Sequence, residues 1–191
     1  MIELKNITSG YNGSPVVRDI SLQFKEGTIT SIIGKNGCGK STLLKTASRL
    51  LKPLSGDILM NGESILNIPD KRIARKISFL PQTRNVPNMT VYSLVMHGRF
   101  PYLGFPRIPQ KDDRDIVEDS MNKLGVSAYR NKNIQELSGG ERQKVYLSML
   151  LAQDADYIFL DEPTTYLDIN YQLEIMEIVK GLRAKRKTVV M

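Results

Sequence analysis

The stretch TITSIIGKNGCGKSTLLKTASRLL, residues 28–51, gives the clearest indication of the fold. Its first part, residues 28–33, is β-branched and apolar enough for a buried strand, and residues 40–51 have the apolar spacing of a helix. A glycine-rich turn joins the two. A strand that passes through such a turn into a helix is typical of an α/β fold, in which helices cover a largely parallel core sheet.

Residues 34–41 of this stretch, GKNGCGKS, fit the P-loop pattern G-x-x-x-x-G-K-[ST]. Glycines let backbone N–H groups close around a polyphosphate, and the N-terminus of the next helix adds its positive dipole end. Lys40 then reaches the β and γ phosphates, and the Ser41 hydroxyl binds Mg²⁺. A plain glycine turn would explain the glycines but not Lys40 and Ser41 together. We predict that ATP with Mg²⁺ binds through Gly34, Asn36, Gly37, Cys38, Gly39, Lys40, Ser41 and Thr42.

The rest of the chain continues the α/β pattern and contains one insert. Short strands are predicted at residues 57–60, 77–80, 157–160 and 188–191, with helices at about 113–124, 140–152 and 170–184. Between Gln82 and Leu137 the strand signal disappears, and prolines punctuate a stretch suited to helices and loops. We predict one domain, 1–191, made of an α/β core (1–82 and 150–191) and an inserted helical subdomain (83–149).

A hydrophobic strand that ends in two carboxylates, YIFLDE at 157–162, supplies chemistry that a P-loop needs. At the end of a core strand these groups emerge beside the phosphate loop. We expect Asp161 to hold the hydrated Mg²⁺ and Glu162 to polarise the attacking water as general base. A strand that runs into an acidic turn is common, so this motif indicates a catalytic site only in combination with the P-loop.

The segment LSGGERQ, residues 137–143, has two interpretations. Ser138 with Glu141 three residues later is a capping box that opens a helix. A cap does not require two glycines, however. Gly139 and Gly140 remove side chains where a backbone must approach something closely, and a serine at a bare helix N-terminus makes a second phosphate-binding surface.

With these motifs in this order, the chain resembles the ABC ATPase family, whose signature is the L-S-G-G-[EQ]-x-Q segment. The resemblance covers essentially the whole chain and implies a P-loop NTPase that hydrolyses ATP to drive transport. It also implies a head-to-tail homodimer, in which Ser138 and Gly140 of one copy face the γ-phosphate held by Lys40 of the other. One copy alone then lacks half of each active site.

The resemblance assigns further residues by position. Tyr11 stands where the family places an aromatic ring against adenine. Gln82 matches the glutamine that touches Mg²⁺ and the attacking water and links to the insert. Residues 165–168 match the loop that signals across the dimer, with Tyr166 in place of a small residue. We expect catalytic roles for Glu162, Gln82, Ser138 and Gly140, and metal contacts for Ser41, Gln82 and Asp161.

A stretch in the insert narrows the class of transporter. Residues 89–91 and 94–102, MTV and LVMHGRFPY, resemble a segment of the ATPases that serve iron-siderophore, haem and cobalamin importers. The implied partners are integral-membrane permease subunits and, indirectly, an extracytoplasmic substrate-binding protein, with the chain at the cytoplasmic face of the cell membrane. The aromatic residues Phe100, Tyr102 and Phe105 either receive a permease helix or fill the core of the insert.

Composition limits the alternatives. The chain has 41% hydrophobic and 25% charged residues, no apolar run long enough to span a bilayer, no export signal, and one cysteine, Cys38. A net charge of +7 permits nucleic acid as a partner, so the alternative is an ABC ATPase acting on nucleic acid or ribosomes. We expect no nucleic acid, because the insert lacks the sustained heptads of one such type and the chain lacks the second P-loop of the other.

A third alternative is a chain that binds ATP with little turnover. In the family, a histidine that contacts the γ-phosphate follows the strand after the Asp-Glu pair, and here the chain stops in the matching strand, 188–191. The one histidine, His97, belongs to the insert. We therefore expect a C-terminally truncated polypeptide that hydrolyses ATP far more slowly than an extended version. The last strand should also leave an apolar surface and an exposed sheet edge.

Overall fold

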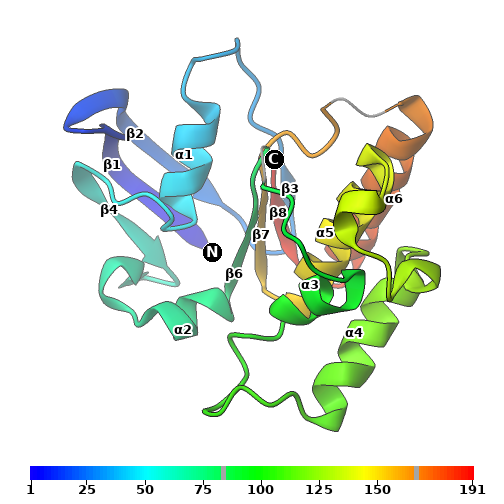
Figure 1. Ribbon diagram of the computed structural model, residues 1–191. Helices are drawn as coiled ribbons and strands as arrows, with labels where there is room; N and C mark the ends of the chain where they lie inside the picture. Colours follow the sequence, from blue (N-terminus) through cyan, green and yellow to red (C-terminus); the bar gives the residue numbers. More distant parts are fainter. Residues whose placement is uncertain (83–84, 166–167) are drawn as a thin grey trace.

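A computed structural model describes residues 1–82, 85–165 and 168–191, and it contains two four-stranded sheets flanked by helices (Figure 1). One sheet is parallel and has the strand order β3-β8-β7-β6. Its strands are β3 (Ile29–Thr30), β6 (Ile77–Leu80), β7 (Tyr157–Leu160) and β8 (Thr188–Val190). The predicted α/β class with a parallel core sheet is confirmed, and four of the predicted strands lie in this sheet.

The second sheet is antiparallel, and the sequence patterns predict only one of its strands, at residues 57–60. Its order is β2-β1-β4-β5, formed by β1 (Ile2–Tyr11), β2 (Ser14–Phe24), β4 (Ser55–Met60) and β5 (Glu63–Ser64). The pairing of β1 with β2 shifts register where Asn6 and Asp19 adopt positive φ angles of 48° and 49°. Their side chains are hydrogen-bonded at 2.9 Å. Such irregularities interrupt the period-two alternation by which a strand is recognised.

Three helices accompany the two sheets. They are α1 (Lys40–Ala47), the short α2 (Asp70–Ala74) and the long α6 (Ile169–Ala184). α1 ends four residues before the predicted end at residue 51, because Arg49 adopts a φ of 63° and the Leu50 N–H turns back to the Lys45 carbonyl. Within the described ranges, no helix combines the length and apolarity that crossing a bilayer requires.

The segment between β6 and β7 is helical. It holds α3 (Val91–His97), α4 (Lys111–Lys123) and α5 (Gly139–Gln153). Its described residues form no strand, only an isolated bridge between Thr90 and Asn133. α4 and α5 lie close to the predicted ranges, whereas α3 is not predicted. The division into core and subdomain stays a prediction, and α5 runs across the boundary placed at residues 149–150.

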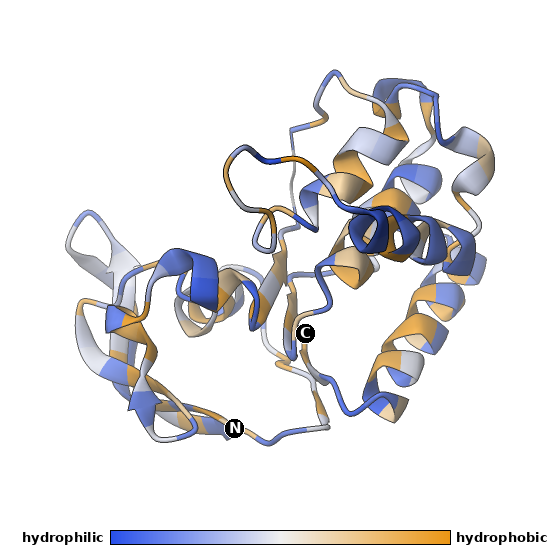
Figure 2. Ribbon diagram, turned by 90° about the horizontal axis from the view of Figure 1, so that it is seen from below, coloured by the Kyte–Doolittle hydropathy of each residue, from blue (hydrophilic) through white to orange (hydrophobic). Residues whose placement is uncertain are grey.

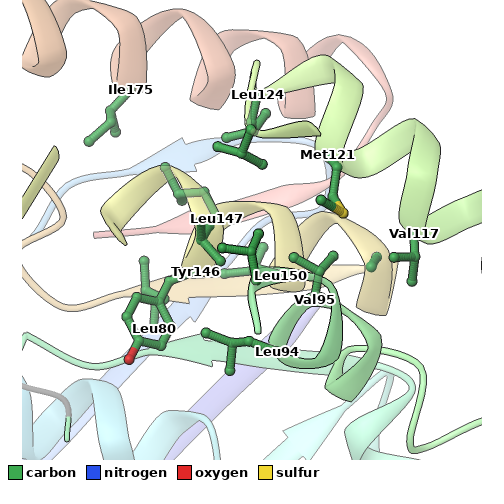
Figure 3. Packing of buried hydrophobic residues seen from close by; sticks show 14 of the residues in the cluster. Leu80, Leu94, Val95, Val117, Met121, Leu124, Tyr146, Leu147, Leu150 and Ile175 are labelled. Atoms are coloured by element: carbon green, nitrogen blue, oxygen red, sulfur yellow. The ribbon is translucent and has the colours of Figure 1, made fainter. Parts of the chain in front are cut away.

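The parallel sheet lies between two hydrophobic cores, and β7 shows why. Ile158 and Leu160 belong to the core shared with α3, α4 and α5. Figure 3 shows side chains of this core from the three helices, among them Leu94, Met121 and Leu147. Tyr157 and Phe159 belong to the core shared with α1 and the antiparallel sheet. Successive side chains of a strand point to opposite faces, so a strand that is apolar at every position must be covered on both. The strands of this sheet are accordingly mostly hydrophobic, while the helices carry residues of both kinds (Figure 2).

The last strand, β8, is an inner strand, so the prediction of an exposed sheet edge there is wrong. β3 pairs with it on one side and β7 on the other. The amide of Val189 donates to the Thr28 carbonyl at 2.9 Å, and the amide of Ile32 donates to the Met191 carbonyl at 2.6 Å. The order of strands in a sheet is a tertiary property that strand patterns do not contain. Apolar exposure occurs instead just after β3, where Ile33 is 93% exposed.

Candidate nucleotide-binding and catalytic site

The loop from β3 to α1, residues 34–39, presents backbone groups more than side chains. Gly37 and Gly39 have φ angles of 78° and 99°, in the left-handed region that favours glycine. Gly39 also lacks room for a side chain, since a Cβ there would lie 2.6 Å from Val17. It is the N-cap of α1, so the unpaired N–H groups of the first helical turn adjoin the loop. Together with the helix dipole, these groups form the anion site that the P-loop pattern predicts.

The two polar side chains at the start of α1 have different partners. Lys40 Nζ donates to the carbonyls of Gly34 and Lys35 at 2.9 and 3.0 Å, so its ammonium group lies across the loop. The Ser41 hydroxyl donates to Asp161 Oδ1 at 2.8 Å. This bond joins α1 to the end of β7 across 120 residues of sequence, and Asp161 is only 3% exposed. A buried carboxylate therefore meets a hydroxyl directly beside the phosphate loop.

These oxygen donors fit a magnesium ion that is shared with a phosphate. Mg²⁺ prefers octahedral oxygen coordination, keeps several waters, and usually takes one or two protein groups together with substrate phosphates. Among residues 1–82, 85–165 and 168–191, no cluster of three or more His, Cys, Asp or Glu side chains is arranged to hold a metal ion. The Ser41–Asp161 pair suits a metal whose other ligands are phosphate oxygens and water.

Glu162 follows Asp161 and is held by two side chains. Gln82 Nε2 donates to Glu162 Oε2 at 2.5 Å, and Thr165 Oγ1 donates to the same oxygen at 2.9 Å. The φ of Glu162 is 49°, a conformation that is uncommon for a residue with a side chain and frequent at functional sites. Because β6 and β7 are parallel neighbours, the residues that follow them reach the same edge of the sheet.

A cavity of about 480 Å³ brings together residues that are far apart in the sequence. We call it the nucleotide cavity; it is lined by Tyr11, Val16, Asn36, Gly37, Gly39, Lys40, Ser41, Thr42, Gln82, Glu162 and Thr165. Tyr11 ends β1 and is 45% exposed, so its ring is accessible for stacking. Val16 and Thr165 are lining residues that the motifs do not identify. Val16 belongs to β2, which the sequence patterns miss, and Thr165 opens the segment matched to the dimer-signalling loop.

Five predicted site residues do not line this cavity. Gly34 and Cys38 pack on each other, since a Cβ added at Gly34 would lie 2.8 Å from Cys38 Sγ, and Cys38 is exposed. Asp161 lies behind Ser41 and is in contact with it. Ser138 and Gly140 belong to a separate place, the N-terminus of α5.

The N-terminus of α5, within the signature segment 137–143, is a second candidate anion site. Ser138 Oγ accepts from the Glu141 N–H at 3.3 Å, and Glu141 Oε2 accepts from the Ser138 N–H at 2.8 Å, which confirms the predicted capping box. Hydrogen bonds from Ser138 and from Tyr129 lower the pKa of Glu141 to about 2. Ser138 is exposed. A single chain therefore presents this helix end without joining it to the nucleotide cavity.

Asp168 begins the last described segment of the chain. Its Oδ1 accepts from the backbone N–H groups of Asn170 and Tyr171 at 3.0 and 3.1 Å, so it is the N-cap of α6. Tyr166, the predicted departure from the family pattern, lies outside the described residues.

Comparison with known proteins identifies the family of the chain. A family model described as ABC transporter matches residues 17–165. The chain is 40% identical over 192 residues to the petrobactin import ATP-binding protein FpuD of Bacillus anthracis, covering 100% of this chain and 70% of that protein. It is 42% identical over 185 residues to the iron(3+)-hydroxamate import ATP-binding protein FhuC of Bacillus subtilis, covering 95% and 68%.

A solved structure shares the fold across the whole chain. It is a dimeric ATP-binding cassette in a post-hydrolysis state bound to ADP and Pi, with a TM-score of 0.86 and 28% identity, covering 100% of this chain and 86% of that chain. The fold and the phosphate site thus define a P-loop ATPase. More narrowly, the chain belongs to the ABC transporter family and is one of its ATP-binding subunits.

Proposed function

We propose that the chain binds and hydrolyses ATP, with Mg²⁺, as a subunit of an importer for an iron siderophore. The observation that carries this proposal is the meeting of α1, β6 and β7 at one cavity, where Ser41 contacts Asp161 and Gln82 contacts Glu162. The relatives named above are import proteins for petrobactin and for iron(3+)-hydroxamate, which favours an iron chelate as cargo. Haem and cobalamin are further candidates, because the insert pattern resembles the ATPases of those importers as well.

Each part of the nucleotide cavity has a task in this proposal. The first-turn N–H groups of α1 bind phosphate oxygens, and Lys40 exchanges its two carbonyl partners for the β and γ phosphates. Tyr11 stacks on adenine. Ser41, Asp161 and Gln82 hold Mg²⁺, which neutralises phosphate charge when it is bound. Glu162, oriented by Gln82 and Thr165, accepts the proton of the attacking water.

The second half of the active site comes from a second copy of the chain. Ser138 and Gly140 lie at an exposed helix end, and no residue of the signature segment lines the nucleotide cavity of its own chain. Such a helix end favours an anion, and its glycines allow a close approach of the backbone. Head-to-tail pairing would bring it over the γ-phosphate of the partner. The likeness to a dimeric cassette with bound ADP and phosphate supports this arrangement.

A groove on the insert suits a helix of a membrane permease. This insert groove has a volume of about 650 Å³, and its apolar and aromatic lining includes His97, Phe100, Leu103, Phe105 and Met149. Phe105 is fully exposed and Phe100 is 36% exposed. Exposed aromatic side chains around a groove commonly mark protein interfaces. Tyr102 instead belongs to the interior of the insert, because its hydroxyl donates to the Gln153 carbonyl at 3.0 Å.

The importer-like pattern shapes the loop that carries these aromatic residues. A Cβ at Gly98 would lie 2.2 Å from the Met149 carbonyl oxygen, so only glycine lets the end of α3 approach α5 this closely. Arg99, 7% exposed, forms a 3.0 Å ion pair with the buried Asp113. Lys71 of α2 donates to the Leu103 carbonyl at 2.8 Å. These contacts fix the shape of the loop at which we propose that the permease docks. The cytoplasmic face of the membrane, and a substrate-binding protein that acts only through the permease, belong to the same proposal.

Reconstitution tests the proposal. ATP hydrolysis is measured with the chain alone and with the copurified permease in liposomes, and we expect stimulation by the permease. Phe105→Ser should remove the stimulation while ATP affinity is kept; the control is Ile108→Ser, which changes another exposed apolar side chain that does not line the groove. Stimulation by DNA or ribosomes, and not by the permease, would favour the nucleic-acid alternative.

A further inference from the structure

The aromatic ring of Tyr171 packs directly on Gly140. A Cβ added at Gly140 would lie 2.9, 3.0 and 3.1 Å from Cζ, Cε2 and Cε1 of that ring. Both residues lie in the first turns of their helices, Gly140 in α5 and Tyr171 in α6, so the two helix N-termini meet here. A side chain at residue 140 would have to displace the ring. The contact thus requires that residue 140 has no side chain, a reason for glycine that the signature pattern alone does not reveal.

Neighbouring groups hold the ring in this position. Lys144, one turn further along α5, has its Nζ 4.9 Å from the centroid of the Tyr171 ring, and it forms a 2.8 Å ion pair with Glu174 of α6. The backbone N–H of Tyr171 is bound by the Asp168 carboxylate at 3.1 Å. The tyrosine is therefore tied to α5 through its ring and to Asp168 through its backbone.

A second tyrosine supports the same helix end from another side. The Glu141 carboxylate raises the pKa of the Tyr129 hydroxyl, which shows that the two groups interact. Glu141 in turn accepts from the Ser138 backbone. The capping box with Tyr129 fixes the first turn of α5 from its polar side. The Tyr171 ring packs on the backbone of Gly140. Because glycine has no side chain, this contact restricts the movement of the Gly140 backbone.

We propose that Tyr171 is a positioning residue, which holds Gly140 where the signature segment meets the partner's γ-phosphate and connects that segment to Asp168. This inference rests on the proposed function, in which Ser138 and Gly140 act on the nucleotide of a second copy. A displacement of Asp168 reaches Gly140 through two direct contacts, one hydrogen bond and one packing contact. Asp168 and the signature segment of the same chain are thus linked through Tyr171.

The atoms that contact Gly140 belong to the Tyr171 ring. Tyr171→Phe should therefore keep this contact, and Tyr171→Ala should remove it. Amide hydrogen exchange at residues 139–142, measured without nucleotide, should rise about tenfold in Tyr171→Ala and stay at the wild-type rate in Tyr171→Phe. In steady-state ATP hydrolysis, Tyr171→Ala should lower kcat by about 10- to 100-fold with little change in KM, because a misplaced group acts mainly on the transition state. Glu177→Ala, on the exposed surface of α6, is the matched control.

A steric double-mutant cycle gives an independent measurement. Gly140→Ala should lower the Tm of the chain by about 2–4 °C, and adding Tyr171→Ala should recover part of this loss, since the ring that meets the new methyl group is gone. Unchanged exchange at residues 139–142 in Tyr171→Ala, or strictly additive Tm shifts, would overturn the inference. A wild-type chain that neither binds nor hydrolyses ATP would overturn the proposed function instead, while the exchange and Tm comparisons would still decide the role of Tyr171.

Discussion

The nucleotide cavity and the N-terminus of α5 are both suited to phosphate, but a single chain completes only the first of them. At the cavity, α1 and the end of β1 converge with residues that follow β6 and β7, and these residues together line one space. At α5, Ser138 is exposed, and the neighbouring groups support the helix end rather than enclose a ligand. Binding of ATP and its turnover should therefore be separable in this molecule: one chain should suffice for binding, and two should be needed for turnover.

The largest expected effect separates turnover from binding inside the nucleotide cavity. Glu162→Gln keeps the shape of the side chain but removes the base, so kcat should fall by about 10²- to 10⁴-fold. The affinity for ATP, measured by calorimetry, should stay close to wild type. Glu177→Gln, an exposed change on α6, is the control. Turnover at the wild-type rate in Glu162→Gln would show that another group activates the water.

A smaller effect is expected when binding itself is attacked. Lys40→Ala removes the ammonium group that faces the phosphates, and the loss of a charge-assisted hydrogen bond should weaken ATP binding by roughly 10- to 100-fold. Isothermal calorimetry of the nucleotide-free chain measures this directly, with Lys45→Ala in the last turn of α1 as the control. An unchanged affinity would refute the assignment of the P-loop as the binding site.

Cys38 reports on the same loop without any mutation. It is exposed and adjoins the N-terminus of α1, so an alkylating reagent can reach its thiol. If bound nucleotide covers it, Mg²⁺-ATP at about ten times its Kd should slow alkylation about tenfold. Mass spectrometry can follow the labelling, because Cys38 is the one cysteine of the chain. Equal rates with and without nucleotide would place Cys38 away from the bound phosphates.

The smallest expected effect is a change in Tm when the capping carboxylate at the N-terminus of α5, Glu141, is replaced. The pKa of Glu141 is lowered from 4.5 to about 2, so its ionised form stabilises the folded chain. This contribution is complete above the unfolded pKa and is lost as the pH falls from about 4.5 towards 2. Glu141→Gln should therefore lower Tm by about 2–4 °C at pH 7 and progressively less in acid. A Tm difference that does not change with pH would exclude the capping carboxylate as its cause; Glu63→Gln on β5 is the control.

Much of the site was accessible to sequence reasoning because its chemistry is local. The P-loop glycines, the Asp-Glu pair after β7 and the capping box at Ser138 each lie within a few residues of sequence. The structure adds the contacts Ser41–Asp161 and Gln82–Glu162. The catalytic roles of these residues stay predictions. Polar residues that follow parallel strands also share one edge of the sheet, which is why the Asp-Glu pair is expected beside the P-loop.

What sequence reasoning missed depends on pairing between distant segments. The antiparallel sheet is hidden by the positive φ angles at Asn6 and Asp19, which break the alternation of two long strands. The inner position of β8 depends on its pairing with β3, which lies far away in the sequence. The packing of Tyr171 on Gly140 likewise joins two helix starts, and neither helix pattern contains a signal for it.

The oligomeric state of the chain in the presence of ATP shows whether a second copy completes the active site. In the Glu162→Gln background, where ATP should persist, light scattering with Mg²⁺-ATP should show conversion of the chain to a dimer. Adding Ser138→Arg places a bulky side chain at the exposed start of α5 and should abolish the dimer, while calorimetry shows ATP affinity within about twofold of the parent, because this residue does not line the cavity. A dimer that persists in Ser138→Arg, or a large loss of ATP affinity in this variant, would contradict the assignment of the N-terminus of α5 to the nucleotide site of a second copy.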